Sequence, residues 1–257
     1  MNWYPQIGAG AMAQFPLHRK RQWRAIANVM ESGELVSLPD STGGQIEWRL
    51  SYQELTDVEV ANLTGLYGNS SGGAIPFGFV DPFANLLGWS EDLSQAGWQT
   101  GQLVTTGGMS DPVGTQRAWM LQNTTGAEQL LSQSAGLPGS YAACFSAYVR
   151  GESAGTIGII RDGARINLPV GQQWKRIQIG GRGTSGAIQA TFSLAIASGS
   201  SVRAFGLQVE AQPWPSPYRP TGAASGILEE TRFSGDLAVT NTAPGLSSCQ
   251  VTLVSRV

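Results

Sequence analysis

Cysteine, histidine and charge are all scarce in this sequence of 257 residues. The two cysteines, Cys144 and Cys249, lie far apart, and together with one histidine they supply neither a disulfide scaffold nor a zinc site. Charged residues make up 13% of the chain and the formal net charge is −2. This argues against a protein that coats nucleic acid, because binding phosphates across a surface requires a large basic excess. Long apolar runs are also missing, so we expect no membrane insertion.

The single histidine, His18, restricts the enzyme chemistry that the chain could perform. Any Ser-His-Asp or Cys-His arrangement must use it, yet its neighbours are basic residues and no nucleophile motif accompanies it. Adjacent carboxylates such as Glu229 and Glu230 would point to opposite faces of a strand, so they cannot flank one glycosidic bond. We therefore expect no enzyme. The N-terminus lacks the basic and apolar segments of a secretory leader, which predicts synthesis in the cytoplasm.

Glycine and proline are plentiful, with 34 and 13 residues, and short runs of alternating apolar residues lie between them. This texture predicts a mostly β protein with many short strands. Residues 45–52 alternate as in a half-buried strand. Ser51 and Glu54 then form a capping-box pattern that predicts a helix ending near Gly68. The apolar residues assigned to that helix are Leu55, Val58, Leu63 and Leu66.

From residue 85 to residue 221 the pattern predicts strands separated by glycine-containing turns, which is typical of a β-sandwich or jelly roll. Alternation is clear over residues 141–147 and 188–196, and it places Phe205, Leu207 and Val209 on one face of a strand. A proline-rich exit segment follows from Pro213. The last residues, 249–257, alternate again and predict a final strand.

Four motifs in the second region resemble the carbohydrate-binding-type jelly rolls of phage tail proteins. Residues 85–93 read NLLGWSEDL, with Trp98 shortly after, and resemble the opening of such modules. Residues 146–150 (SAYVR) and 174–177 (WKRI) resemble two of their strands, and residues 205–210 (FGLQVE) with 218–221 (YRPT) resemble their exit. Leu93 stands where phenylalanine is usual, and Phe205 stands where tryptophan is usual.

The first region resembles, less closely, the N-terminal domain of phage distal tail proteins. The shared pattern is a strand, a capped helix, a glycine-rich turn and the sequence FGFVDP at residues 77–82. In that family the domain is a β-sandwich with one helix. Here only residues 226–257 are left to complete its sheet. The resemblance therefore implies a discontinuous ring domain, residues 1–83 and 226–257, with a jelly roll of residues 84–225 inserted in one of its loops.

These resemblances imply a structural protein of the virion. Six copies would form a ring at the distal end of the tail, between the tail tube protein and the hub proteins of the baseplate. The inserted jelly roll would contact either host-surface glycans or neighbouring tail proteins. The alternative is an adhesin whose main role is glycan binding. Symmetry separates the two, because a tail ring is sixfold whereas fibre-like adhesins are usually trimers or monomers.

A dense basic stretch near the N-terminus contains Arg19, Lys20, Arg21 and Arg24. It could contact DNA that passes through a ring, or it could form ion pairs with a neighbouring subunit. We favour the subunit contact, because a channel through which DNA slides should not bind phosphates tightly.

Glu91 and Glu210 fall in the opening and closing motifs of the jelly roll. Jelly rolls of the kind that these motifs resemble often bind structural calcium near that junction, which makes the two carboxylates candidate ligands. The other interpretation is that they accept hydrogen bonds from backbone N–H groups, and we favour it because no Asp/Asn-rich loop accompanies them.

Aromatic side chains are the candidates for sugar binding, because a sugar ring stacks its C–H face on an indole or phenol ring. Most tryptophans of the second region fall within the motifs that build the sandwich. Trp119 and Trp214 lie outside them, and we therefore assign these two as candidate glycan-binding residues.

Overall fold

The computed structural model describes residues 1–40, 43–184 and 186–256, and it confirms a mostly β fold with one α-helix in the described residues. The chain divides into two compact units. Unit 1 comprises Met1–Gly8, Met12–Phe79 and Leu228–Val257, and unit 2 comprises Ala9–Ala11 and Val80–Ile227. None of the helices in the described residues has the length and apolar character that spanning a bilayer requires.

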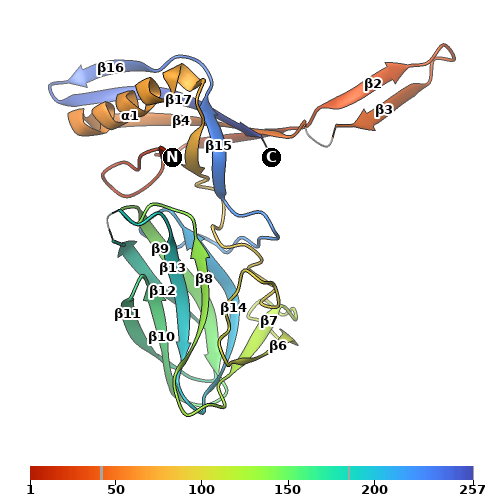
Figure 1. The fold of residues 1–257 in the computed structure, drawn as a ribbon, viewed down its shortest axis with the longest axis vertical. Coiled ribbons are helices and arrows are strands. Elements are labelled where there is room, and N and C mark those ends of the chain that lie inside the picture. Colours follow the sequence, from red (N-terminus) through yellow and green to blue (C-terminus); the bar gives the residue numbers. More distant parts are fainter. Residues whose placement is uncertain (41–42, 185, 257) are drawn as a thin grey trace. The chain divides into compact units, whose positions relative to one another are not determined.

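Unit 1 contains a six-stranded sheet and the helix (Figure 1). In spatial order the strands are β1 (Leu17–Gln22), β4 (Gln45–Thr56), β17 (Leu246–Arg256), β15 (Ile227–Phe233) and β5 (Phe77–Val80), and β16 (Ala238–Ala243) pairs with β17. Alternation along β4 buries Ile46, Trp48 and Leu50, as predicted. Aromatic rings fill the core: the ring centroids of Trp48 and Phe79 lie 5.1 Å apart.

The helix of unit 1 begins later than the sequence predicts. The helix α1 spans Asp57–Asn69, and the capping box is formed by Thr56 and Glu59. The predicted box of Ser51 and Glu54 lies inside β4 and is wrong. Pairing with β17 continues along β4 as far as Thr56, so the sheet ladder overrides the local capping signal. A short 3₁₀ turn, η1 (Ser71–Gly73), follows the helix.

This shift changes the helix face that was predicted. Leu63 and Leu66 are buried on α1 as expected. Leu55 is buried too, but it belongs to β4. Val58 is 70% exposed, so its assignment to the buried face is wrong.

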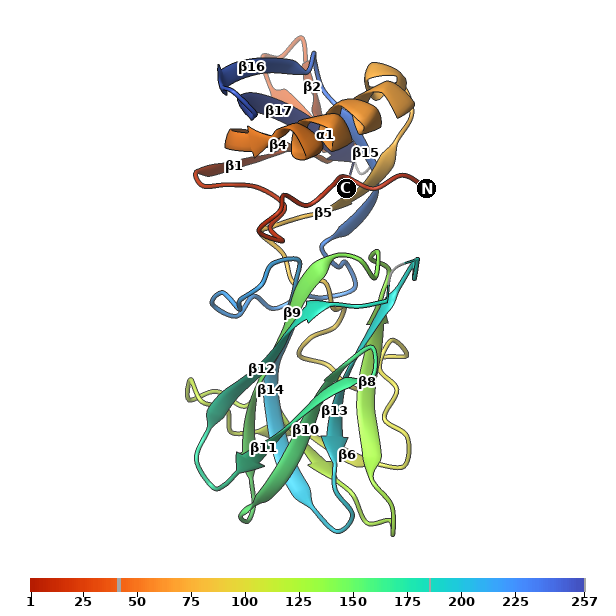
Figure 2. The same cartoon turned by 90° about the vertical axis from the view of Figure 1, so that its left-hand side faces the viewer.

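Unit 2 is a sandwich of two sheets (Figure 2). The four-stranded sheet has the order β11 (Ala164–Val170), β10 (Gly155–Arg161), β13 (Ala190–Ile196), β8 (Gln129–Ala135). The five-stranded sheet has the order β12 (Lys175–Arg182), β9 (Ala142–Gly151), β14 (Ser201–Glu210), β7 (Ala118–Gln122), β6 (Val104–Met109). Apolar side chains from both sheets meet in the core, where the ring centroids of Phe145 and Phe192 lie 5.8 Å apart.

A bulge in β14 places Phe205 on the other face of the strand from the one predicted. The register of β14 against β9 shifts between Phe205 and Gln208, and Gly206 adopts a φ of 63°. Leu207 and Val209 are buried on β14, as expected, but Phe205 packs between Tyr148 and Tyr218. The predicted strand over residues 188–196 begins only at residue 190, and Ile188 is 81% exposed.

The remaining strands of unit 1, β2 (Ala25–Val29) and β3 (Leu35–Pro39), pair only with each other. They form a hairpin that projects from the rest of the unit (Figure 1). Its turn is closed by hydrogen bonds from the N–H of Met30 to the carbonyl of Glu34 and from the N–H of Gly33 to the carbonyl of Met30, each 2.8 Å long. We call residues 23–40 the arm.

Candidate functional sites

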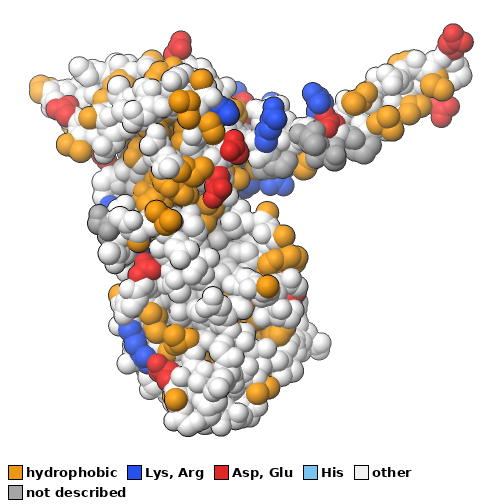
Figure 3. Space-filling model, in the orientation of Figure 1, with side chains coloured by type: hydrophobic (Ala, Val, Ile, Leu, Met, Phe, Trp, Pro, Cys, Tyr) orange, Lys and Arg blue, Asp and Glu red, His pale blue; other side chains and the backbone are white. Residues whose placement is uncertain are grey.

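The arm exposes far more apolar surface than a free hairpin tolerates. Six large apolar residues between positions 23 and 38 are each at least half exposed: Trp23, Ile26, Val29, Met30, Leu35 and Leu38. Figure 3 shows hydrophobic atoms along the arm. An isolated two-stranded hairpin is marginally stable in water, and contiguous exposed apolar surface marks an interaction site. We therefore treat the arm as a candidate docking surface.

Both faces of the arm are apolar. The register pairs Ile26 with Leu38, and these side chains lie on one face. It pairs Val29 with Leu35, and this pair lies on the opposite face because the two sets are three residues apart along β2. A hairpin that simply lay on a surface would need only one apolar face. An arm with two apolar faces suits insertion between other elements.

The basic stretch is divided between two places in unit 1. Arg19, Lys20 and Arg21 lie on β1, which is an edge strand of the sheet, and all three are exposed. Arg19 pairs with Trp48 across β1 and β4, so it stands on the face where that indole is buried. Arg24 lies apart from them at the base of the arm. Basic side chains on an edge strand also oppose unwanted strand pairing.

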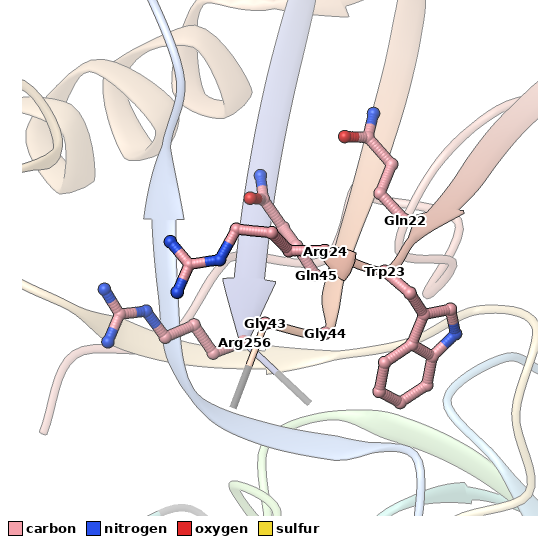
Figure 4. A pocket seen from close by; sticks show the side chains of 7 residues that line it. All are labelled: Gln22, Trp23, Arg24, Gly43, Gly44, Gln45 and Arg256. Atoms are coloured by element: carbon pink, nitrogen blue, oxygen red, sulfur yellow. The ribbon is translucent and has the colours of Figure 1, made fainter. Parts of the chain in front are cut away.

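The base of the arm contains a cavity of about 490 Å³. It is lined by Gln22, Trp23, Arg24, Gly43, Gly44, Gln45 and Arg256. Figure 4 shows the guanidinium groups of Arg24 and Arg256 extending in the same direction. Arg24 is fixed by Asp40, with its Nε 2.6 Å from Oδ2. Arg256 has no ion-pair partner in the part of the chain that the structure describes.

In unit 2, the opening and closing motifs of the jelly roll lie side by side. The buried Asn85 donates from Nδ2 to the carbonyl of Leu207 and accepts at Oδ1 from the N–H of Val209. The Thr221 hydroxyl donates to the carbonyl of Leu87 at 2.6 Å. The N–H of Gly226 donates to the carbonyl of Asn85. These bonds join the start and the end of the segment.

The two candidate metal ligands have separate partners. Glu91 forms an ion pair with Arg117, with Oε1 2.8 Å from Nη1. Glu210 is buried and accepts from the N–H of Ser216 at 2.9 Å and from Nε2 of Gln208 at 2.7 Å. Among the described residues, no three His, Cys, Asp or Glu side chains lie close enough to hold a metal ion.

The two candidate glycan-binding tryptophans differ in their surroundings. Trp119 is half-buried, and its Nε1 donates to the carbonyl of Glu91 at 2.9 Å. Its ring lies so close to Gly107 that a Cβ there would be 3.1 Å from it. Trp214 is 71% exposed and belongs to the exit segment. Trp214 therefore presents an open aromatic surface, whereas Trp119 is held against β6.

A row of arginines on the outer face of the five-stranded sheet was not singled out from the sequence. Ala147 and Val149 of β9 are buried in the sandwich, so Tyr148 and Arg150 point to the outer face. The register then places Arg176 beside Tyr148 and Arg203 beside Arg150. We call these four residues, Tyr148, Arg150, Arg176 and Arg203, the arginine–aromatic face.

The arginines of this face are partnered unequally. Arg203 forms an ion pair with Glu152, with an Nε to Oε1 distance of 2.7 Å. Arg176 lies over the Tyr148 ring, 5.3 Å from its centroid, and donates to the Ser146 hydroxyl at 3.0 Å. The Nε groups of Arg150 and Arg176 are buried and make no hydrogen bond within the described chain. Buried donors are normally satisfied, so these two Nε groups are exceptions within the described chain.

Comparison with known proteins gives similarity at the level of structure alone: no protein family and no curated protein matches the sequence. A tailspike protein 4 domain of bacteriophage CBA120 is similar over 51% of this chain and 22% of that chain, with 16% identity and a TM-score of 0.39. A family 22 carbohydrate-binding module of Clostridium thermocellum Xyn10B is similar over 52% of this chain and 97% of that chain, with 15% identity and a TM-score of 0.41. The xylan-binding module of Paenibacillus barcinonensis Xyn10C is similar over 51% of this chain and 96% of that chain, with 14% identity and a TM-score of 0.40. Each of these similarities covers about half of this chain.

Proposed function

We propose that this protein is a structural component of a phage tail tip, in which unit 1 assembles into a ring between tail tube and baseplate hub. The observation that carries the proposal is the arm, whose exposed apolar faces require a covering partner. The resemblance of residues 1–83 to distal tail proteins supports a ring of six copies. The exposed basic side chains of β1 add charges that would pair with a neighbouring subunit.

Assembly is tested by comparing the chain with a variant that carries Ile26→Ser and Leu38→Ser. The two residues face each other across the arm and contribute no buried core, so the variant should fold with an unchanged melting temperature. Sedimentation and electron microscopy of the unaltered chain should show a sixfold particle, and the variant should stay monomeric. The matched control is Val58→Ser, which alters an exposed apolar residue outside the arm. A chain that stays monomeric at every concentration would contradict the proposal.

The proposal includes a discontinuous ring domain, formed by residues 1–83 and 226–257 around an inserted jelly roll. The hydrogen bonds of Gly226 to Asp81 and to Asn85 hold the two ends of the segment together, as an insertion in one loop requires. Replacing residues 85–224 by a short Gly/Ser linker should leave a folded, β-rich protein by circular dichroism. If that product is unfolded while residues 1–225 alone are stable, the discontinuous domain is wrong.

The arginine–aromatic face favours glycan binding as a second function of the same protein. A guanidinium group binds a carboxylate through two parallel hydrogen bonds, and Arg150 has no ion-pair partner among the described residues. The exposed indole of Trp214, in the exit segment, supplies a separate surface for stacking. Glycans that carry carboxylates therefore fit the face best. Each copy would bind weakly, and a ring of copies would strengthen attachment by avidity.

Glycan binding is tested with a uronic-acid polysaccharide and the same polysaccharide after reduction of its carboxyl groups. The unaltered chain should bind the acidic form, and Arg150→Gln should weaken binding about tenfold, roughly the loss of one charge-assisted hydrogen bond. Arg165→Gln is the matched control, because Arg165 lies on the other sheet and pairs with Glu128. Equal binding of both polysaccharides would refute recognition of the carboxylate. No binding of either would leave unit 2 as a spacer.

A further inference from the structure

The two ends of the arm carry opposite charge. At the tip, Glu31 and Glu34 flank Gly33 in the turn, both are exposed, and neither carboxylate has an ion-pair partner among the described residues. At the base, Arg24 and Arg256 line the cavity, and Arg21 is the second-last residue of the nearby strand β1. Figure 3 shows acidic atoms at the far end of the arm and basic atoms where it leaves the unit.

The acidic side chains at the tip of the arm cannot reach the basic side chains at the base of the same arm. Glu31 lies seven positions after Arg24, which in an extended strand corresponds to about 24 Å. The hairpin is straight in Figure 1, so its acidic tip points away from the basic cavity of the same chain. A second copy is the partner that offers a matching end to each of the two sites.

We propose that the arm tip of one copy docks in the base cavity of the next copy. Glu31 and Glu34 would pair with Arg256 and with the outward donors of Arg24, while Met30 and Leu35 would pack on the exposed Trp23. Such a contact is head-to-tail, because two different surfaces meet, and it closes into a ring when the rotation between copies allows. This inference rests on the proposed function, since it specifies how the assembling surfaces meet.

Charge reversal tests the contact. Glu31→Lys with Glu34→Lys should weaken association at least about tenfold, and Arg256→Glu should also weaken it, because each places like charges together. Combining all three changes in one chain should restore much of the association. The control is Asp236→Lys, which reverses one acidic charge at an exposed position of unit 1 outside the arm. Arg24 is left unchanged because it holds the base through Asp40.

Cross-linking gives an independent measurement. Chains with Glu34→Cys mixed with chains carrying Gln22→Cys should form a covalent dimer on oxidation, and neither variant should do so alone. The native thiols, Cys144 and Cys249, are buried and will not compete. If the unaltered chain assembles but there is neither charge rescue nor a mixed dimer, the arm docks elsewhere and this inference is wrong. If the unaltered chain never assembles, the proposed function itself fails.

Discussion

The two units of this protein differ in how their exposed apolar side chains are distributed. Unit 2 buries apolar side chains between its own sheets, and the large apolar residues that it exposes, such as Val113 and Ile166, are scattered singly. Unit 1 also has a well-packed aromatic core, yet its arm exposes six large apolar residues within sixteen positions of sequence, from 23 to 38. Single exposed apolar residues are normal on any protein, whereas a contiguous stretch implies a partner.

Because of this difference, we expect substitutions in the cores and substitutions on the arm to affect different properties of the protein. Substitutions inside either core should lower the free energy of unfolding of that unit, and changes on the arm should act on association alone. Under the proposed function, this difference would let unit 1 join a ring while unit 2 remains a separate module. The sandwich of unit 2 covers its own core, while the arm of unit 1 leaves its apolar side chains exposed.

The largest expected effect comes from Leu63→Asp on α1. Leu63 is 3% exposed, so the change would remove a packed side chain and bury a carboxylate without a partner. We expect a loss on the order of 4 kcal/mol or more of unfolding free energy, measured by denaturant titration. Val58→Asp on the same helix is the control, because Val58 is 70% exposed and should lose under about 1 kcal/mol. Equal losses would show that α1 does not pack as described.

A smaller but still large effect is expected from Arg161→Met in unit 2. Arg161 is buried, and its Nη1 and Nη2 donate to the carbonyls of Ala143 and Tyr141 at 2.9 and 2.8 Å. Methionine keeps much of the volume but leaves both carbonyls without these donors, so we expect a loss of about 2–4 kcal/mol. Thermal unfolding should show this loss. Assembly through the arm should persist below the lowered melting temperature, and its disappearance would break the separation of the two units.

A pH-dependent effect of intermediate size is expected at Asp111. Burial acts to raise the pKa of Asp111, but hydrogen bonds from Thr115, Arg117 and Val113 outweigh it and lower the pKa below the ordinary 3.8. The stabilisation is therefore complete above the unfolded-state pKa and is lost as the pH falls through the lower folded pKa. Asp111→Asn should cost about 1–2 kcal/mol at neutral pH and should flatten the loss of stability in acid. An unchanged acid profile in this variant would contradict the assignment.

Much of the fold follows from the sequence, because period-2 alternation specifies the buried face wherever a strand is regular. The buried faces of β4, β9 and β17 were predicted in this way. The errors arise where a non-local contact decides the outcome. Pairing with β17 extended β4 past the expected capping box, and the bulge at Gly206 turned Phe205 to the other face. Neither contact can be read from neighbouring residues.

The candidate surfaces were less predictable than the strands. The arm sequence alternates weakly and has no polar face, so periodicity did not predict its two strands. Arg150 was noted only as part of a strand motif, and its unpartnered Nε depends on what the register places beside it. The basic stretch was visible in sequence, but only the fold separates Arg24 at the arm base from the strand that holds the other three.

The smallest effect on stability is expected at Trp214, and its comparison with Trp119 sharpens the account of unit 2. Trp214 is 71% exposed, so Trp214→Ala should change the unfolding free energy by less than about 0.5 kcal/mol. Trp119→Ala removes the hydrogen bond to Glu91 and the contact with Gly107, and it should cost about 2–3 kcal/mol. Binding to the acidic polysaccharide, measured by calorimetry below the melting temperature of both variants, should fall for Trp214→Ala and stay unchanged for Trp119→Ala. The reverse pattern would move the stacking surface from the exit segment to β7 and would make the ring of Trp119 part of the site.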